Sequence, residues 1–216
     1  MIVTTQKPLD EILDFISPYK DILIVGCDGC TQPPRGIREA KALGQLLELG
    51  GKLKGRSFRF KEITTAKQCD SFLTASELKP HMEGVEAVLS LACGLGPQTI
   101  AELFPNLPVF PAQDTYFIGM EDREGNYLEE RCSSCGSCIL AETGGICPVT
   151  RCAKGLLNGP CGGTNNGKCE VDPEKDCAWT LIYQRLEAQG RLDLFDKYRS
   201  PRNFQVVLRP GKITPK

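Results

Sequence analysis

Short apolar runs alternate with amphipathic segments over the first 125 residues of the chain. The run Asp21–Gly26 (DILIVG) has the length of a buried strand, and residues 37–49 carry apolar side chains at helical spacing. The same reading predicts helices over residues 9–16, 76–82 and 100–104 and strands over residues 57–63, 85–92, 107–110 and 116–118. Strands that alternate with helices favour a parallel sheet with right-handed crossovers. The sequence therefore predicts a small Rossmann-like α/β domain over residues 1–125.

This pattern of apolar and polar positions stops at about residue 125. Glycine, cysteine, asparagine and proline dominate until helical periodicity resumes in Trp179–Ala188 (WTLIYQRLEA). We interpret residues 126–216 as a second domain, an irregular cysteine-rich module followed by this helix and a basic tail. The tail begins at Lys197, has no acidic residue and includes the apolar run Phe204–Leu208. It is expected to be either disordered or an arm that docks on a partner.

Composition and charge narrow the class of protein. The chain has 216 residues, of which 41% are hydrophobic and 25% charged, and these values are typical of a soluble globular protein. A net charge of −1 disfavours a nucleic-acid binder. The N-terminal sequence lacks the basic and apolar regions of a signal peptide, and no run approaches the roughly 20 apolar residues that span a bilayer. We therefore expect a cytoplasmic protein without a membrane span.

Twelve cysteines and a single histidine, His81, define the candidate chemistry. Because cytoplasmic thiols are kept reduced, a dense cysteine pattern indicates metal or cluster ligation rather than disulfides. One histidine excludes zinc sites that need two or three imidazole ligands. What remains is all-thiolate coordination, either in four-cysteine zinc sites or in iron–sulfur clusters.

The first candidate site consists of four cysteines that follow three predicted strands, and we call them the first cysteine set. The carboxyl ends of parallel strands lie at one edge of a sheet, where α/β proteins bind their ligands. Neighbouring glycines let the backbone approach closely. An iron–sulfur cluster is the preferred interpretation, with a zinc site or unliganded buried thiols as alternatives. The set comprises Cys27 and Cys30 in VGCDGC, Cys69 after the second strand, and Cys93 in LACGLG.

The second candidate region holds the other eight cysteines, from Cys132 to Cys177. The two-residue gaps in CSSCGSC are typical of a ferredoxin-type cluster loop, whose remaining ligand often precedes a proline, as Cys147 does. Eight thiols suit two sites of four ligands each. The predicted partition gives Cys132, Cys135, Cys138 and Cys177 to one site and Cys147, Cys152, Cys161 and Cys169 to the other.

One long motif in this region resembles a known family. Residues 144–179 read GGICP…CAKGLLNGPCGG…GKCEV…CAW and are similar to the C-terminal cysteine-rich domain of methylenetetrahydrofolate reductase. In acetogen-type enzymes that domain forms a separate small iron–sulfur subunit of the MetV type, and the VGCDGC and ACGLG loops resemble its N-terminal half. The resemblance implies two or three [4Fe–4S] clusters held by the twelve cysteines, with zinc in one site as the alternative.

The resemblance also implies a partner. In such enzymes a TIM-barrel subunit holds flavin and folate, and this chain has neither the length nor the repeat of a barrel. The chain is then expected to be a non-catalytic subunit of a heteromeric oxidoreductase of one-carbon metabolism, in the Wood–Ljungdahl pathway. It would pass electrons from a low-potential donor such as ferredoxin to the partner's flavin, which reduces methylenetetrahydrofolate to methyltetrahydrofolate. The alternatives are a structural zinc-binding scaffold of the same complex and a thiol enzyme with a reactive Cys27, although no base is evident near it.

Overall fold

The computed structural model of the chain describes residues 1–207 and 209–214 and contains two compact units. Met1–Phe117 will be called the α/β unit and Ile118–Lys216 the cysteine-rich unit. The predicted α/β class with a parallel sheet is confirmed. The division between the units falls within strand β7 (Gln113–Asp122), before the boundary predicted near residue 125. The end of β7 pairs with β8 (Tyr127–Cys132) in an antiparallel hairpin, so residues 118–125 belong to the cysteine-rich unit.

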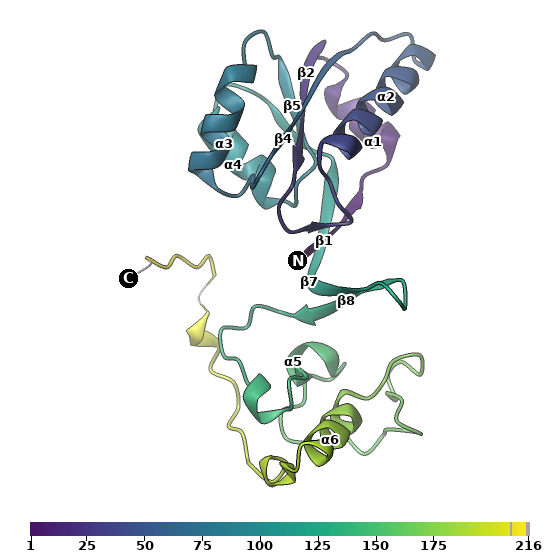
Figure 1. Cartoon of the computed structure of the whole chain (residues 1–216), viewed down its shortest axis with the longest axis vertical. Helices are drawn as coiled ribbons and strands as arrows, with labels where there is room; N and C mark the ends of the chain where they lie inside the picture. Colours follow the sequence, from purple (N-terminus) through teal and green to yellow (C-terminus); the bar gives the residue numbers. More distant parts are fainter. Residues whose placement is uncertain (208, 215–216) are drawn as a thin grey trace. The chain divides into compact units, whose positions relative to one another are not determined.

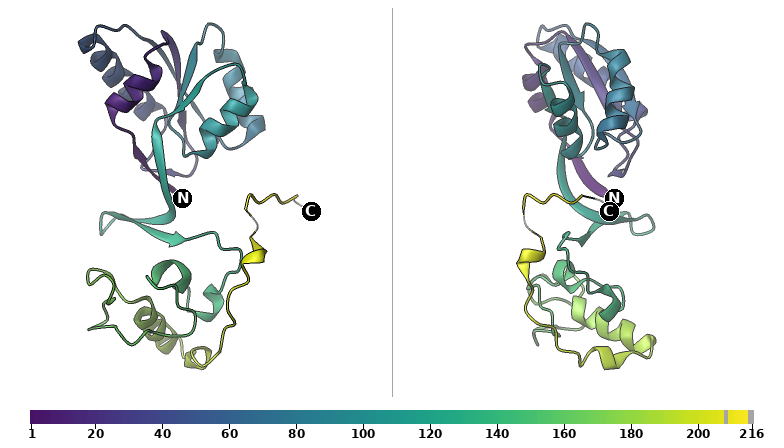
Figure 2. Two further views of the ribbon diagram at one scale, coloured as in Figure 1. Left: turned by 180° about the vertical axis from the view of Figure 1, so that it is seen from behind. Right: turned by 90° about the vertical axis from the view of Figure 1, so that its left-hand side faces the viewer.

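The α/β unit is built on a parallel sheet with the strand order β4–β2–β5–β6. The central strand β2 pairs with β4 and β5, and β5 pairs with β6. Two helices cover each face of this sheet (Figures 1 and 2). The strands are β2 (Asp21–Cys27), β4 (Arg59–Thr65), β5 (Ala87–Ser90) and β6 (Val109–Pro111), and the helices are α1 (Leu9–Ile16), α2 (Ile37–Leu53), α3 (Ser71–Leu78) and α4 (Leu95–Leu103), with a 3₁₀ turn at Lys79–His81.

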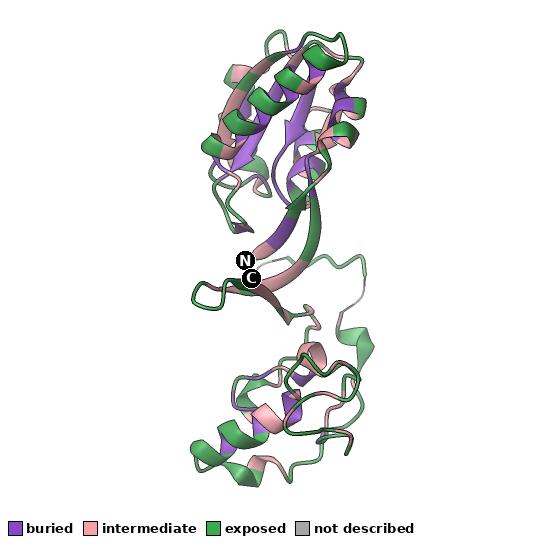
Figure 3. Cartoon of the chain, turned by 90° about the vertical axis from the view of Figure 1, so that its right-hand side faces the viewer, coloured by how far each residue is buried: buried purple, intermediate pink, exposed green. Residues whose placement is uncertain are grey.

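Side chains of β2 alternate between two apolar cores. Ile22 and Ile24 pack with buried residues of α1 and α2, whereas Leu23 and Val25 pack with buried residues of α3 and α4. All four side chains are almost completely buried, and the central strands β2 and β5 are buried along nearly their whole length (Figure 3). Because side chains of a strand alternate strictly, Cys27 at the end of β2 faces the same side as Val25, the side of α3 and α4.

Further strands have the order β3–β1–β7–β8. In the α/β unit β1 (Ile2–Gln6) pairs in parallel with the two-residue strand β3 (Thr31–Gln32). Strands β1, β3 and β8 were not predicted from the sequence pattern. Each is short or mixed in polarity, and its strand conformation depends on pairing with a neighbouring strand.

Helices α2, α3 and α4 differ in their bounds from the predicted helices, and α4 covers Leu95–Leu103 where residues 100–104 were predicted. Helix α2 continues through Gly50 and Gly51 to Leu53 instead of ending at the glycines. A Cβ on Gly51 would lie 2.6 Å from the ring of Phe58, so this glycine permits close packing rather than helix termination. Helix α3 begins at Ser71, five positions before the prediction, because the Asp70 carboxylate accepts the N–H groups of the next turn.

The cysteine-rich unit has one small apolar cluster. Its centre is helix α6 (Ala178–Ala188), which was predicted to begin at Trp179, and it packs with the short helix α5 (Pro148–Arg151). Tyr183 was predicted on the packed face but is 43% exposed and contacts Phe195 edge to face. Short 3₁₀ turns lie at Leu140–Glu142, Leu192–Leu194 and Phe204–Val206. The fully or nearly buried side chains of the cluster are Ile146, Trp179, Ile182 and Leu186.

Candidate functional site

The first cysteine set lies at the carboxyl edge of the parallel sheet. Cys27 ends β2, Cys69 lies two residues before α3, and Cys93 lies two residues before α4. Cys27 and Cys93 are 8% and 7% exposed, whereas Cys30 and Cys69 are open to solvent. The set therefore has a buried pair of thiols, Cys27 and Cys93, and an exposed pair, Cys30 and Cys69.

The four thiols of this set are close enough to influence one another. Burial is the main cause that raises the pKa of the Cys93 thiol, and the backbone N–H of Leu95 opposes it. The negative charge of the Cys30, Cys69 and Cys27 thiolates adds to the rise. The structure thus brings all four sulfur atoms into one neighbourhood, where repulsion between thiolates favours a shared cation or cluster.

A glycine allows the loop after β2 to close over this edge. The N–H of Cys27 donates to the carbonyl of Arg35 over 2.7 Å, so the chain returns to β2 after the cysteine loop. A Cβ on Gly26 would lie 2.8 Å from that carbonyl oxygen and from Gly36. Any larger residue at position 26 would push the loop away from Cys27.

Gln68 links two strands of the sheet next to the first cysteine set. The sequence analysis did not identify this residue. Its side chain is completely buried, and Nε2 donates to the carbonyls of Val25 (2.9 Å) and Gly26 (2.8 Å). Oε1 accepts from the Ser90 hydroxyl over 2.7 Å, so one amide ties β2 to β5. The next residue is Cys69. The position of Gln68 next to Cys69 is the one sequence feature that could have indicated its role, because a single glutamine in a loop forms no pattern.

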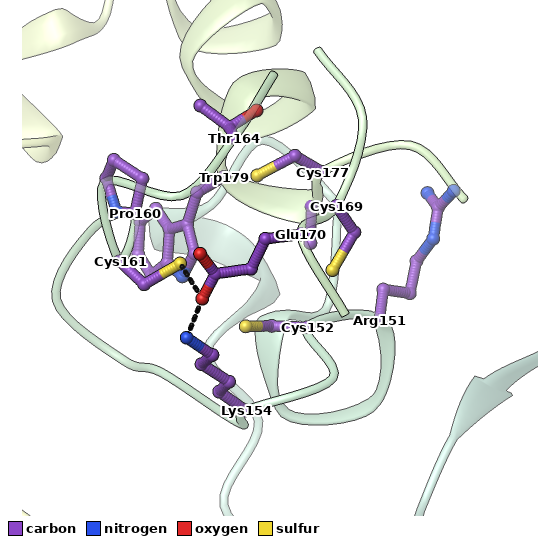
Figure 4. Close-up of a pocket in the computed structure, with 11 residues that line it drawn as sticks. Arg151, Cys152, Lys154, Pro160, Cys161, Thr164, Cys169, Glu170, Cys177 and Trp179 are labelled. Atoms are coloured by element: carbon purple, nitrogen blue, oxygen red, sulfur yellow. Dashed lines mark hydrogen bonds and ion pairs between the residues drawn. The ribbon is translucent and has the colours of Figure 1, made fainter. Parts of the chain in front are cut away.

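Four cysteines of the second region line one pocket of the cysteine-rich unit, and we call them the pocket cysteines (Figure 4). Two short bridges, Asn165–Lys168 and Lys168–Asp176, fold the intervening chain into a hairpin-like loop. The N–H of Cys177 donates to Gly167 (2.7 Å) and the N–H of Cys169 donates to Lys175 (2.9 Å). The pocket cysteines are Cys152, Cys161, Cys169 and Cys177.

This grouping differs from the predicted partition, which gave Cys147 to this site and Cys177 to the other. The hairpin-like loop is the reason, because it carries Cys177 back beside Cys169. Cys147 instead begins helix α5, which packs against β8, the strand that ends in Cys132. Arg151 of α5 also pairs with Glu129 of β8 over 3.2 Å. The elements that carry Cys147 and Cys132 are therefore neighbours.

Cys177 is held in a setting that favours its thiolate form. It is the residue that precedes helix α6. Burial by itself would raise the pKa of Cys177, but the backbone N–H and hydroxyl of Thr180, the hydroxyl of Thr164 and the N–H of Trp179 outweigh it and lower the pKa. A thiolate is the form of cysteine that ligates metals.

Glu170 and Lys154 share the pocket with these thiols (Figure 4). The Cys161 thiol donates to the Glu170 carboxylate over 3.5 Å, and the same oxygen pairs with the Lys154 ammonium. Cys161 is thereby turned toward Glu170. Within residues 1–207 and 209–214, no three His, Cys, Asp or Glu side chains are arranged to hold a metal ion as they stand.

Cys132, Cys135 and Cys138 form the loop that follows β8, and we call them the loop cysteines. Ser134 and Gly136 both have a positive φ, of 48° and 71°, which turns this loop tightly. The N–H of Ser134 donates to Cys132 Sγ over 3.4 Å. Cys132 and Cys138 are exposed.

The start of the basic tail packs on the cysteine-rich unit, so the disordered alternative fails there. Arg199 is 8% exposed, and its guanidinium donates to the Glu142 carboxylate (2.9 Å) and to the carbonyl of Leu157 (3.2 Å). Farther along, Arg202 donates to the carbonyl of Cys135 over 3.0 Å. Phe204 and Val206 of the predicted docking run are exposed, and Leu208 lies outside the described residues.

Several buried side-chain atoms near the cysteines have no hydrogen-bond partner among the described residues, and their positions indicate whether an anionic group would fit there. Thr64 and Thr65 end β4 beside Gly26 and Cys27, and two of the remaining residues flank Cys132. The Thr65 donor, which pairs in register with Cys27, and the donors next to Cys132 suit thiolate or sulfide sulfur, which accepts hydrogen bonds from its surroundings. Among the described residues, the buried side-chain atoms without a hydrogen-bond partner are Thr64 Oγ1, Thr65 Oγ1, Gln113 Nε2, Arg131 Nε and Ser133 Oγ.

Fold and sites together define an α/β protein with an appended cysteine-rich unit, in which all twelve cysteines are free thiols. Residues 110–205 match the family described as the C terminal of methylene-tetrahydrofolate reductase. This match spans less than half of the chain, and it takes in the segment that holds the loop cysteines, Cys147 and the pocket cysteines. No curated protein and no solved structure matches the chain. Among the helices that the structure describes, none is long and apolar enough to cross a membrane.

Proposed function

We propose that the chain is the iron–sulfur subunit of a methylenetetrahydrofolate reductase complex. It accepts electrons from a low-potential donor such as ferredoxin and passes them to the flavin of a TIM-barrel partner, which reduces methylenetetrahydrofolate to methyltetrahydrofolate. The observation that carries this proposal is the gathering of free thiols at separate sites in a chain related to that reductase. We further propose that it works in the cytoplasm.

Three groups of four thiols would hold the prosthetic groups. They are the first cysteine set, the pocket cysteines, and the loop cysteines together with Cys147, whose helix packs against β8. The last group has the two-residue gaps and the Cys–Pro ending of a ferredoxin-type loop. When bound, a [4Fe–4S] cluster supplies one-electron transfer at low potential. The lowered pKa of Cys177 and the unpaired side chains of Thr65, Arg131 and Ser133 support such anionic groups.

The position of the single histidine supports an electron relay rather than acid–base catalysis. His81 lies in the turn Lys79–His81, which follows the C-terminal end of α3. Cys69 lies at the opposite end of this eight-residue helix, which is roughly 12 Å long. No imidazole is thus available at the first set to activate a thiol, and Cys27 is a ligand in this proposal rather than a nucleophile.

Structural zinc at the pocket cysteines is the second candidate, and one observation favours it. Four thiols on turns beside a helix N-terminus are typical of a closed structural zinc site. The chain would then be a scaffold subunit of the same reductase if zinc filled every site. With zinc only in this pocket, the relay would use the other two groups.

Electron transfer to the flavin tests the proposal directly. The anaerobically reduced chain would be mixed with the partner subunit carrying oxidised flavin, and flavin bleaching followed by stopped-flow absorbance. We expect bleaching whose rate rises with chain concentration and falls strongly in Cys93→Ser. His81→Gln is the matched control and should behave like the wild type. A complex that forms but leaves the flavin oxidised would overturn the relay and favour the scaffold.

A further inference from the structure

A threonine at the end of β4 lies beside the first cysteine set. The register of the two strands pairs Thr65 with Cys27 and Thr64 with Gly26. Paired residues of neighbouring parallel strands face the same side of a sheet, and successive residues face opposite sides. Thr65 therefore shares the α3/α4 face with Cys27, and Thr64 lies on the α1/α2 face.

The Thr65 hydroxyl is buried and unpaired. The residue is 1% exposed, and within residues 1–207 and 209–214 Oγ1 has no hydrogen-bond partner. The backbone carbonyl of Thr65, in contrast, accepts the N–H of Asp28 over 2.9 Å. A buried hydroxyl without a partner destabilises a fold, and valine has nearly the same shape without this disadvantage. Packing alone therefore does not explain a threonine at position 65.

Nearby polar groups on the same face are already engaged. The Ser90 hydroxyl donates to Gln68 Oε1 over 2.7 Å and accepts the N–H of Ala92 over 3.3 Å. Gln68 Nε2 donates to two β2 carbonyls. The Thr65 donor is left facing the side on which the Cys27 thiol lies.

We propose that the Thr65 hydroxyl donates a hydrogen bond to sulfur of the group held by the first cysteine set, at the Cys27 ligand. This inference rests on the proposed function, because it needs a redox-active group at that set. A donor to sulfur stabilises the more negative, reduced form of the group and so raises its reduction potential. Thr65 is then a positioning residue that adjusts the reduction potential of this site. The reduction potential decides whether the site accepts electrons before or after the other sites.

Potentiometry on the anaerobically purified full chain tests the role of Thr65. The resonance of the first site is identified in electron paramagnetic resonance spectra by its loss in Cys93→Ser. In Thr65→Val we expect the midpoint potential of that resonance to fall. The expected change is up to about tenfold in the one-electron equilibrium constant, or ~59 mV. Thr65→Ser keeps the hydroxyl and should stay near the wild-type potential.

Thr64→Val is the matched control, because it removes an equally unpaired hydroxyl from the opposite face. Equal potentials in Thr65→Val and Thr64→Val, with full iron and sulfide content, would overturn the inference and leave the proposed function standing. A wild-type chain without iron and sulfide would overturn the proposed function first. Loss of iron in Thr65→Val but not in Thr65→Ser supports the hydroxyl contact, whereas loss in both variants overturns it.

Discussion

The two units use cysteine in opposite ways. In the α/β unit two apolar cores hold the sheet and its helices together, and the first cysteine set occupies the ends of elements that those cores already fix. The cysteine-rich unit contains eight cysteines, and its apolar cluster, among the described residues, has four buried side chains with Cys152 and Cys177 packed against them. So small a core stabilises a fold weakly unless metal or disulfide bonds support it. Under the proposed function, the fold would position the ligands in the first unit, and the bound groups would stabilise the fold in the second.

Removal of the proposed metal or cluster groups should give the largest difference in stability between the two units. On treatment with a chelator under denaturant-free, anaerobic conditions, we expect the cysteine-rich unit to lose its structure because metal–thiolate bonds replace most of its core. The α/β unit should keep its sheet. Hydrogen exchange with mass spectrometry would show lost protection in α6 and retained protection in β2 and β5. Equal retention in both units would contradict the comparison.

Truncation of Trp179 should give the next largest effect. Its side chain is 2% exposed, its Nε1–H donates to Leu156 O over 3.0 Å, and its ring packs edge to face on Phe195. Trp179→Ala is expected to cost the cysteine-rich unit about 3–5 kcal/mol of its free energy of unfolding. The measurement is denaturant unfolding, monitored by the hydrogen-exchange protection of the backbone amides in α6.

Tyr183→Ala is the control for Trp179→Ala. It removes a half-exposed aromatic ring from the same helix and the same Phe195 contact. The loss should be about 1 kcal/mol, the scale of a single aromatic pair. Similar losses in the two variants would mean that the cluster is not the core of this unit.

Gln68→Leu should have an intermediate effect, confined to the α/β unit. It leaves two β2 carbonyls and the Ser90 hydroxyl without their buried partner. The expected loss is about 1–3 kcal/mol in the unfolding of this unit, with lower iron content at the first cysteine set. Gln98→Leu removes an exposed amide that donates to the Gly94 carbonyl, and it should change neither quantity.

Acid titration should show the smallest effect, in both units alike. The Arg59 hydrogen bond is the main cause that lowers the pKa of Asp21, and Lys197 does the same for the pKa of Glu142. A carboxyl with a lowered folded-state pKa stabilises the protein above its unfolded pKa, and this contribution is lost as the pH falls through the folded value.

Asp21→Asn should therefore make the free energy of unfolding of the α/β unit depend slightly less on pH in the acid range. Near neutral pH the variant should be only slightly less stable than the wild type. The Asp21–Arg59 ion pair lies at the surface, with side chains 28% and 68% exposed, so the effect is weak. Unfolding curves recorded at a series of acid pH values would measure it. A steeper dependence in the variant would contradict the assigned direction.

The sequence revealed the parts of the fold that have a strong period of their own. The buried run of β2 and the amphipathic α1, α2 and α6 were visible because apolar residues recur at strand or helix spacing. Strands β1, β3 and β8 were not, since they are defined by their partners. The end of α2 was misplaced because Gly50 and Gly51 serve packing contacts that a sequence pattern does not show.

The cysteines were predicted as ligands from their spacing, and they stay a prediction, but the spacing did not indicate which of them line the same pocket. Spacing reveals which cysteines share a tight turn, as in CSSCGSC, but the place of Cys177 depends on a hairpin-like loop closed by Lys168 and Asp176. Gln68 and Thr65 were invisible, because the burial and pairing of a single polar side chain exist only in the folded chain.

The central claim is that thiolates of this chain hold redox-active iron–sulfur groups. Iron, zinc and acid-labile sulfide per chain, measured on anaerobically purified protein, test it most directly. The account predicts iron and sulfide in near-equal amounts, at about eight to twelve of each, depending on whether the pocket cysteines hold a cluster or zinc. Zinc without iron or sulfide would contradict the account and leave a structural subunit.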